Sequence, residues 1–198
     1  MIVDTHLLIS QIIYKYLSTQ MNFKLNRIDF ALGNIKPDFI NKDIKRSHTL
    51  DESLDNVNKY SEELMNSNIS NKEFSRSLGV ICHFLCDYYC IYHREGNDKK
   101  GVFEHTVYEV ILHIKLLTLL LRGKLKLNNY EMFEDNVESI VLKVEEEYNL
   151  ESKSLTRDIN YALFAASQVS SLIVCSNQLY FEKKQANIPK EYGLNSVN

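Results

Sequence analysis

Apolar residues recur every three or four positions along most of this chain, which is the spacing of helices that bury one face. Between residues 4 and 18 the apolar positions repeat in this way, and Asp4 is placed to cap the start of the helix. Residues 51 to 66 show the same period. No stretch shows a strand-like alternation that is longer than its helical competitor, so we predict an all-α protein.

Two segments, from about residue 72 to 93 and from about 102 to 122, are apolar on most sides. Helices of this kind belong in the middle of a bundle, so we expect them to form the best-packed part of the fold. Ser70 or Asn71 can cap the first of these helices. Gly123 is placed to end the second.

The connecting segments and the second half of the chain complete the prediction. The polar sequence REGNDKKG at residues 94 to 101 is the clearest loop, and residues 37 to 41 follow a predicted Gly-Asn-Ile-Lys-Pro turn. Two further helices are expected over residues 129 to 148 and 152 to 184.

Length and composition are those of one globular domain. The chain has 198 residues, of which 44% are hydrophobic and 25% charged, and it contains only 2 Pro and 6 Gly to interrupt helices. Neither an internal repeat nor a low-complexity linker divides it. We therefore expect a single-domain helical bundle of about seven or eight helices over residues 1–185, followed by a polar tail at 186–198.

Charge and targeting signals narrow the class of partner. The net charge is -3 and the pI is near 6.1, so we expect no nucleic-acid partner. The N-terminus lacks the features of a secretory signal, and the longest apolar run, residues 116 to 121, is too short to span a bilayer. These features, with four cysteines expected to be reduced, favour a cytoplasmic protein without a transmembrane segment.

Candidate chemistry lies at the two apolar helices and the loop between them. His83 and Asp87 are four residues apart, as are His105 and Glu109, and His93 lies between the pairs. Residues four apart on a helix share a face, so each imidazole and carboxylate can converge on one divalent cation. Three of the six histidines have an acid four residues later, whereas fewer than one is expected by chance. The pattern indicates a cluster of metals; the alternative is a set of hydrogen-bonded core histidines.

This set of side chains points to hydrolysis at phosphorus. Imidazole nitrogen and carboxylate oxygen bind zinc at about 2.0–2.2 Å, and zinc sites of this composition with an open position are usually catalytic. Metals roughly 3.5–4 Å apart can hold both the attacking and the leaving oxygen of a phosphoester. We therefore predict a multi-metal site that cleaves phosphoesters.

Four segments together resemble the zinc-dependent phospholipase C family of bacteria. They are LGVICHFLCDYYCIYH at 78–93, HTVYE at 105–109, GNIKPDF at 33–39 and SHTL at 47–50. The resemblance covers about residues 3 to 110. Members of that family are all-α, hold three zincs in a cleft and cleave phospholipids on the glycerol side of the phosphate. The resemblance therefore implies a hydrolase that acts on a phospholipid or a smaller phosphodiester, with peripheral membrane contact.

The resemblance also implies a set of eight metal ligands. One zinc would be bound by Asp38, His48, His83 and Asp87. A second would be bound by His93, His105 and Glu109. A third would take His6, with Asp87 as the bridge. In secreted members an N-terminal tryptophan adds its amine and carbonyl to the third zinc; this chain has no tryptophan, so the expectation is two or three zinc ions.

Other roles follow from the same resemblance. Asp38 would act as the general base, and Phe39 would contact the substrate headgroup; the alternative for Phe39 is an ordinary core aromatic. A related family of single-strand nucleases ends its last ligand pair with aspartate, so Glu109 favours the phospholipase side. The alternative function is a non-catalytic cytoplasmic protein that keeps the zinc cluster for structure or sensing.

Three cysteines, Cys82, Cys86 and Cys90, repeat every four residues beside His83 and Asp87. Thiolates are soft metal ligands and can also sense redox state. Free cysteines are, however, common as small apolar residues in protein cores. We interpret these three as packing residues on the stripe next to the ligands, with metal ligation or redox sensing as the alternative.

Overall fold

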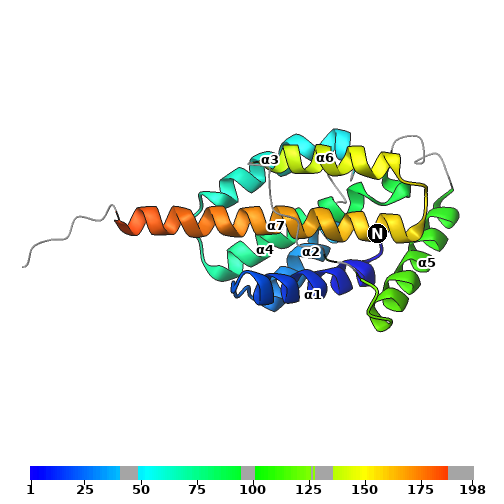
Figure 1. Ribbon diagram of the computed structural model, residues 1–198, viewed down its shortest axis with the longest axis horizontal. Coiled ribbons are helices and arrows are strands. Elements are labelled where there is room, and N and C mark those ends of the chain that lie inside the picture. The colour runs from blue at the N-terminus through cyan, green and yellow to red at the C-terminus, as the bar shows by residue number, and fades with distance from the viewer. Residues whose placement is uncertain (41–48, 95–100, 126, 128–135, 187–198) are drawn as a thin grey trace, which may run out of the picture.

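The computed structural model describes residues 1–40, 49–94, 101–125, 127 and 136–186, and all regular structure in these ranges is helical (Figure 1). The elements in chain order are α1 (Val3–Gln20), α2 (Arg27–Ile40), α3 (Leu50–Met65), α4 (Asn71–Tyr88), the short 3-10 helix η1 (Ile91–His93), α5 (Val102–Leu121), α6 (Val137–Leu150) and α7 (Leu155–Ala186). The prediction of a single-domain, all-α bundle is confirmed.

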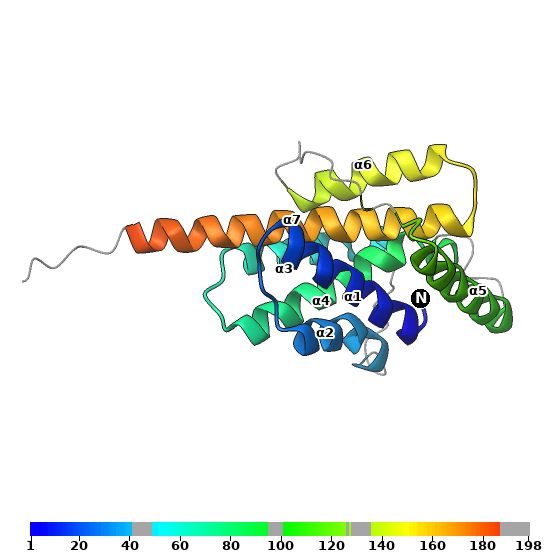
Figure 2. The ribbon, with the colours of Figure 1, turned by 60° about the horizontal axis from the view of Figure 1, so that its bottom comes forward.

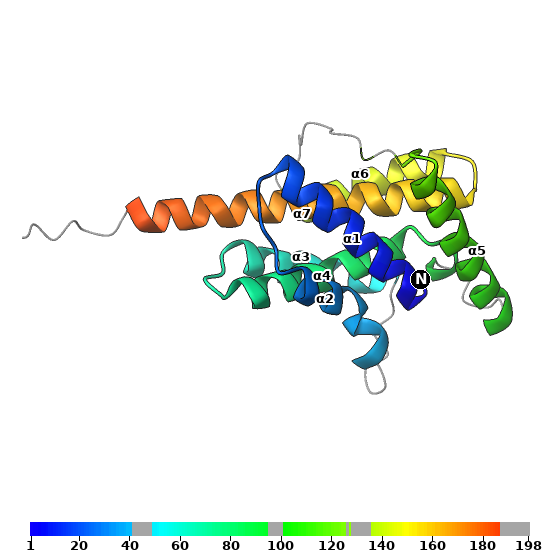
Figure 3. The same ribbon diagram turned by 90° about the horizontal axis from the view of Figure 1, so that it is seen from below.

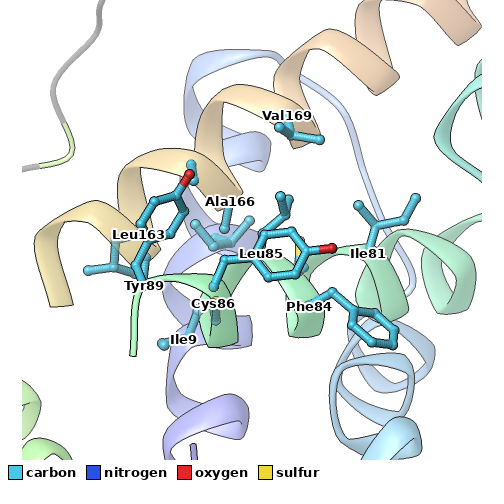
Figure 4. Packing of buried hydrophobic residues seen from close by; sticks show 14 of the residues in the cluster. Ile9, Ile81, Phe84, Leu85, Cys86, Tyr89, Leu163, Ala166 and Val169 are labelled. Carbon is cyan, nitrogen blue, oxygen red and sulfur yellow. The ribbon is translucent and has the colours of Figure 1, made fainter. Parts of the chain in front are cut away.

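Helix α4 lies in the middle of the bundle, between α7 on one side and α2 on the other, and α1 crosses it and also contacts α7 (Figure 2). Ile81, Leu85 and Tyr89 face Leu163 and other apolar residues of α7, and all are buried (Figure 4). Each fully buried aliphatic side chain of this kind contributes roughly 1.5–3 kcal/mol. The predicted central position of this helix is correct, and it gives the candidate metal ligands on α4 a rigid support.

Two glycines bring α2 against α4. A Cβ atom at Gly79 would lie 2.3 Å from the carbonyl oxygen of Phe30, and one at Gly33 would lie 2.0 Å from that of Arg76. Any larger residue would therefore force the helices apart. This close crossing brings the end of α2, which carries Asp38, beside the ligand face of α4.

The N-terminus of α4 is set by a capping box. The Ser70 hydroxyl accepts a hydrogen bond from the Glu73 amide, and the Glu73 carboxylate accepts one from the Ser70 amide. Of the two predicted caps, Ser70 is therefore the correct one. The predicted cap of α1 is wrong, because Ile2 occupies that position and Asp4 lies in the first turn of the helix.

The predicted helix over residues 72 to 93 is too long. Helix α4 ends at Tyr88, Cys90 is extended, and η1 carries His93. The reason is a tertiary contact, because the Ile91 amide donates to the Asp158 carboxylate of α7 at 3.1 Å instead of to a carbonyl one turn earlier. His93 is therefore displaced from the face of α4 that carries His83 and Asp87.

The predicted turn before residue 37 is also wrong. Residues 33 to 37 are helical, and Pro37 lies inside α2. Proline removes one helical hydrogen bond and crowds the carbonyl four residues earlier, which here belongs to Gly33. Burial of Phe30 and Asn34 against α4 offsets this local preference.

Helix α5 departs most from expectation. It stands at one end of α7 and diverges from the rest of the bundle (Figure 3). Only Leu112, Leu116, Leu119 and Glu109 are buried, so α5 does not belong to the best-packed part of the fold. Its bounds and its end before Gly123, which has a positive φ of 61°, agree with the prediction.

Helix α7 has the length and composition of a membrane-spanning segment over Leu155–Glu182. Most of that stretch is buried against the other helices of the bundle, which is the behaviour of a core helix. Its buried face includes small residues such as Ala162, Ala165 and Ala166, which allow close packing on α4. Helix α7 is therefore the second central element of the fold.

Candidate metal centre

The predicted ligands come together at the C-terminal end of α4. The centre is formed by side chains from the first turns of α1, the last turns of α2 and α4, η1, and the first two turns of α5. Two groups have donor atoms within 4.8 Å of one another: His6, His83 and Asp87, and Cys90, His93 and Glu109. Asp87 belongs to the first group and also faces the second, because its Oδ2 lies 3.9 Å from His93 Nδ1.

Asp87 is fully buried and uses both carboxylate oxygens in the centre. Its Oδ1 lies 2.6 Å from the α-amino nitrogen of Met1 and 3.3 Å from His6 Nε2. Its Oδ2 lies 3.3 Å from His83 Nε2 and 3.9 Å from His93 Nδ1. Burial alone would raise the pKa of this carboxyl group, but positive charge on the surrounding histidines and the amine holds it well below its usual value. Asp87 therefore stays ionised, and each of its oxygens faces a different histidine nitrogen at 3.3 Å, His6 Nε2 for Oδ1 and His83 Nε2 for Oδ2.

His83 is oriented by α2. Its Nδ1 lies 2.8 Å from the carbonyl oxygen of Asn34. A carbonyl can only accept, so Nδ1 carries the proton and Nε2 presents its lone pair to the centre. That nitrogen faces Asp87 at 3.3 Å and Asp38 Oδ1 at 3.7 Å. With Nε2 unprotonated, these three acceptor atoms could share a metal cation.

His6 is the clearest sign that the centre is built for a metal. Its ring is fully buried and stacks on His83 with centroids 4.1 Å apart. Neither ring nitrogen has a hydrogen-bond partner among the described residues, although Nε2 lies 3.3 Å from Asp87. Buried polar groups are almost always satisfied, so an orphaned imidazole beside a carboxylate fits a metal ligand.

The second group is organised by Glu109. Its Oε1 lies 3.1 Å from His93 Nε2 and 2.9 Å from His105 Nε2. Burial raises the pKa of Glu109, but hydrogen bonds and positive charge from His93, the Met1 amine and His105 outweigh it and lower the pKa to about 2. The His105 ring also stacks on Tyr92, with centroids 5.3 Å apart, which fixes its orientation.

The Met1 α-amino group lies where the two groups meet. Besides Asp87, it is 3.0 Å from His93 Nε2 and 3.1 Å from Glu109 Oε1. Burial lowers the pKa of this amine, yet the neighbouring carboxylates outweigh burial and raise the pKa to about 11. The electrostatic field of the cluster therefore strongly favours positive charge at its middle.

The donor atoms also have the spacing that a metal requires. Two ligands at 2.1 Å from one ion in tetrahedral geometry lie about 3.4 Å apart. Most of the nitrogen–oxygen distances above fall close to that value. The residues present therefore fit zinc, through His6, Asp38, His83 and Asp87 on one side and His93, His105 and Glu109 on the other.

A buried network behind the centre holds both ligand-bearing segments, and no sequence motif pointed to it. The Asp158 carboxylate of α7 accepts hydrogen bonds from the Ile91 amide at 3.1 Å, from the Tyr148 hydroxyl at 2.8 Å and from the Tyr108 hydroxyl. Arg157 adds a guanidinium contact at 3.2 Å. Ile91 lies in η1 with His93, and Tyr108 directly precedes Glu109. The sequence feature that could have indicated this network is the adjacent pair Arg157 and Asp158 in the first turn of an apolar helix.

Arg94 fixes the other side of His93. Its guanidinium binds the Glu145 carboxylate of α6 with two nitrogens and donates to Asn149 at 3.1 Å. It also lies over the Tyr148 ring, 4.7 Å from the centroid. The position of His93 therefore depends on contacts from both α6 and α7.

Seven of the eight predicted metal ligands lie in this one centre, namely His6, Asp38, His83, Asp87, His93, His105 and Glu109. The eighth, His48, falls outside the described residues. Phe39 lies at the end of α2 beside Asp38 and is 64% exposed, so its ring is available at the surface. Its predicted contact with a headgroup stays a prediction.

Comparison with known proteins agrees with this geometry. A family model described as zinc-dependent phospholipase C matches residues 5–161, which is about four fifths of the chain. The matched range contains all the ligands above and also Asp158. No curated protein and no solved structure matches the chain.

Proposed function

The chain belongs to the zinc-dependent phospholipase C family, and from this premise we propose that it hydrolyses the phosphodiester bond of a phospholipid or of a smaller phosphodiester. The observation that carries the proposal is the convergence of imidazoles and carboxylates around Asp87, with an orphaned and buried His6 among them. Two or three zinc ions would be held by the residues of the two groups. When bound, they would supply Lewis acidity that stabilises charge developing on the phosphoryl and leaving oxygens.

Among the protein's own groups, Asp38 is best placed to act as the general base. Its side chain is 23% exposed, whereas that of Asp87 is fully buried. A water molecule can therefore reach Asp38 while remaining next to the ligand nitrogen of His83, 3.7 Å from Asp38 Oδ1. Asp87 is committed to its surrounding cations, so its role is to hold the cluster together rather than to accept a proton.

The outer surface of α5 supports a lipid substrate. Seven apolar residues point away from the bundle on one side of the helix, which we name the α5 outer face; they are Phe103, Val107, Val110, Ile111, Ile114, Leu117 and Leu121. At 100° per residue they cover one continuous stripe without a charged side chain, opposite His105 and Glu109. A membrane that contacts this stripe would therefore lie within one helix diameter, roughly 10–12 Å, of the metal centre.

A lipid surface suits the α5 outer face better than a second protein copy does. A helix of 20 residues offers a face of about 30 by 10 Å, or roughly 300 Å², whereas a stable interface buries about 800 Å² on each partner. Exposed Arg122 and Lys124 follow the stripe and suit anionic headgroups, while the exposed acid of the helix, Glu104, lies at its other end. The proposed contact is peripheral, through one face of one helix.

A non-catalytic role is the alternative function. The complete burial of His6, His83 and Asp87 favours it, because closed metal sites are usually structural. The partial exposure of Asp38, His93 and His105 favours catalysis, because it leaves an open side next to the buried ligands.

The test is hydrolysis by the full chain of a chromogenic phosphodiester in solution and of phosphatidylcholine in vesicles, with zinc counted by elemental analysis. We expect turnover that a chelator abolishes and zinc restores. Asp38→Asn should reduce turnover by about 100-fold or more while the helical circular dichroism stays unchanged. Asp55→Asn, at an exposed position of α3, is the matched control. Bound zinc without turnover on either substrate would establish the non-catalytic alternative.

A further inference from the structure

The three cysteines on and after α4 share a spacing but have different surroundings. All three are fully buried. The Cys82 Sγ lies 3.1 Å from the Ser170 hydroxyl of α7, and Cys86 belongs to the hydrophobic core drawn in Figure 4. Cys90 follows the end of α4, so it no longer lies on the helical stripe of the other two.

Cys90 faces the candidate metal centre. Its Sγ lies within 4.8 Å of a ligand nitrogen of His93 and of a carboxylate oxygen of Glu109. Its backbone joins the two halves of the centre, because its amide donates to the Asp87 carbonyl at 3.0 Å and its carbonyl accepts from the His93 amide at 2.9 Å. The early end of α4 is therefore what turns this thiol toward the cluster.

We propose that the Cys90 thiolate is a metal ligand together with His93 and Glu109, with His105, whose Nε2 lies 2.9 Å from Glu109 Oε1, as the fourth side chain of the site. The inference rests on the metal cluster of the proposed function but does not depend on turnover. Zinc accepts sulfur at about 2.3 Å together with nitrogen and oxygen ligands in tetrahedral sites. The predicted set of eight metal ligands does not include Cys90.

Proton balance is consistent with the assignment. Burial raises the pKa of the Cys90 thiol to about 12, so without a metal the group is neutral. Binding a divalent ion replaces the thiol proton, which leaves to solvent, and the sulfur–metal bond forms in its place. Without a metal, ionisation of a buried thiol beside a carboxylate is unfavourable, because burial and the neighbouring negative charge both disfavour the thiolate.

The assignment gives the two metal sites of the cluster different roles. Four protein ligands close the site of His93 and Glu109, so the open position needed for chemistry falls to the side of Asp38 and His83. A soft sulfur donor also selects zinc or iron over magnesium or manganese. The proposed enzyme would therefore have one structural ion and its reacting groups around Asp38.

X-ray absorption at the zinc edge of the wild-type, zinc-loaded chain tests the proposal directly. We expect one sulfur at about 2.3 Å from one of the bound ions. A spectrum with only nitrogen and oxygen neighbours, or a chain that binds no zinc, would overturn the inference. This measurement needs no variant and so does not depend on whether a mutant folds.

Cobalt substitution identifies which cysteine supplies the sulfur. We expect a thiolate-to-cobalt charge-transfer band in the near ultraviolet that persists in Cys86→Ser and is absent in Cys90→Ser and Cys90→Ala. The affinity of one zinc should fall by tenfold or more in the Cys90 variants, measured by competition with a chelator. A band that survives in both Cys90 variants would refute the assignment. Turnover without the band removes only the assignment, whereas the band without turnover removes only the proposed hydrolysis.

Discussion

Helices α4 and α5 carry the same local motif, a histidine followed four residues later by an acid, in different environments. Twelve of the 18 residues of α4 are buried, including both His83 and Asp87. Four of the 20 residues of α5 are buried, and His105 remains half-exposed. The same pairing therefore lies in the buried interior of the bundle on α4 and near the protein surface on α5.

This difference shows that the composition of a helix does not determine its burial. Helix α5 is the more apolar of the two, yet its main contacts are with α7 and the start of α1, and its outer face has no partner among the described residues. Helix α4 is contacted by α1, α2, α3 and α7. The sequence pattern of a helix indicates which of its faces are apolar, whereas the helices that pack against it determine which of these faces are buried.

Removing the central acid of each helix should give the largest difference. We expect Asp87→Ala to lose more than one zinc per chain and about 3–5 kcal/mol of stability in the zinc-free protein, because buried positive groups lose their partner. Glu109→Ala should lose one zinc. Elemental analysis and urea denaturation measure both. Loss of a single zinc in Asp87→Ala would argue against its bridging role.

Packing variants test the comparison without touching the ligands. Ile81 is fully buried on α4, and we expect Ile81→Ala to lower the free energy of unfolding by about 2–5 kcal/mol. Ile114 on α5 is 57% exposed, and Ile114→Ala should change stability by less than about 0.5 kcal/mol. Chemical denaturation provides both values. A large loss in Ile114→Ala would mean that the α5 outer face is covered in the folded protein.

Asp158 holds the two segments that carry His93 and Glu109, namely η1 and the start of α5. We expect Asp158→Asn to weaken one zinc by about tenfold, since positioning groups behind ligands typically contribute 10- to 100-fold in affinity. The site of His93 and Glu109 should be affected, because the Ile91 and Tyr108 contacts hold it. Chelator competition measures the affinity. An equal loss at every zinc would instead point to general unfolding.

Membrane contact through the α5 outer face can be tested with a single introduced charge. We expect Ile114→Asp to reduce binding to anionic vesicles by about tenfold in sedimentation assays, with unchanged hydrolysis of a soluble phosphodiester. Leu142→Asp, at a partly exposed apolar position of α6, is the matched control and should bind as the wild type does. Vesicle binding that is equal in both variants would remove the α5 outer face as the docking surface. A dimer that Ile114→Asp dissociates would replace the membrane with a second copy of the chain.

Local pattern was sufficient for several of the helices and for identifying which candidate ligands share a helix face. The 3.6-residue period predicted the bounds of α1, α3 and α5 to within two residues, because the apolar residues of a helix repeat with this period along its buried face. The spacing of His83 to Asp87 and of His105 to Glu109 predicted two ligand pairs, because residues four apart lie on the same face of a helix. The resemblance, carried by short segments with these spacings, agrees with the family whose model matches residues 5–161.

Tertiary structure alone decided the features that depend on contacts between distant segments. The Asp158 bond to Ile91 ends α4 early and separates Cys90 from Cys82 and Cys86, although the sequence spaces all three alike. The packing of α1 also places the Met1 amine against Asp87, 86 positions away. Sequence determines which groups are available and which face they share. Which groups meet, and which faces stay open, depends on the packing of helices that are not neighbours in the chain.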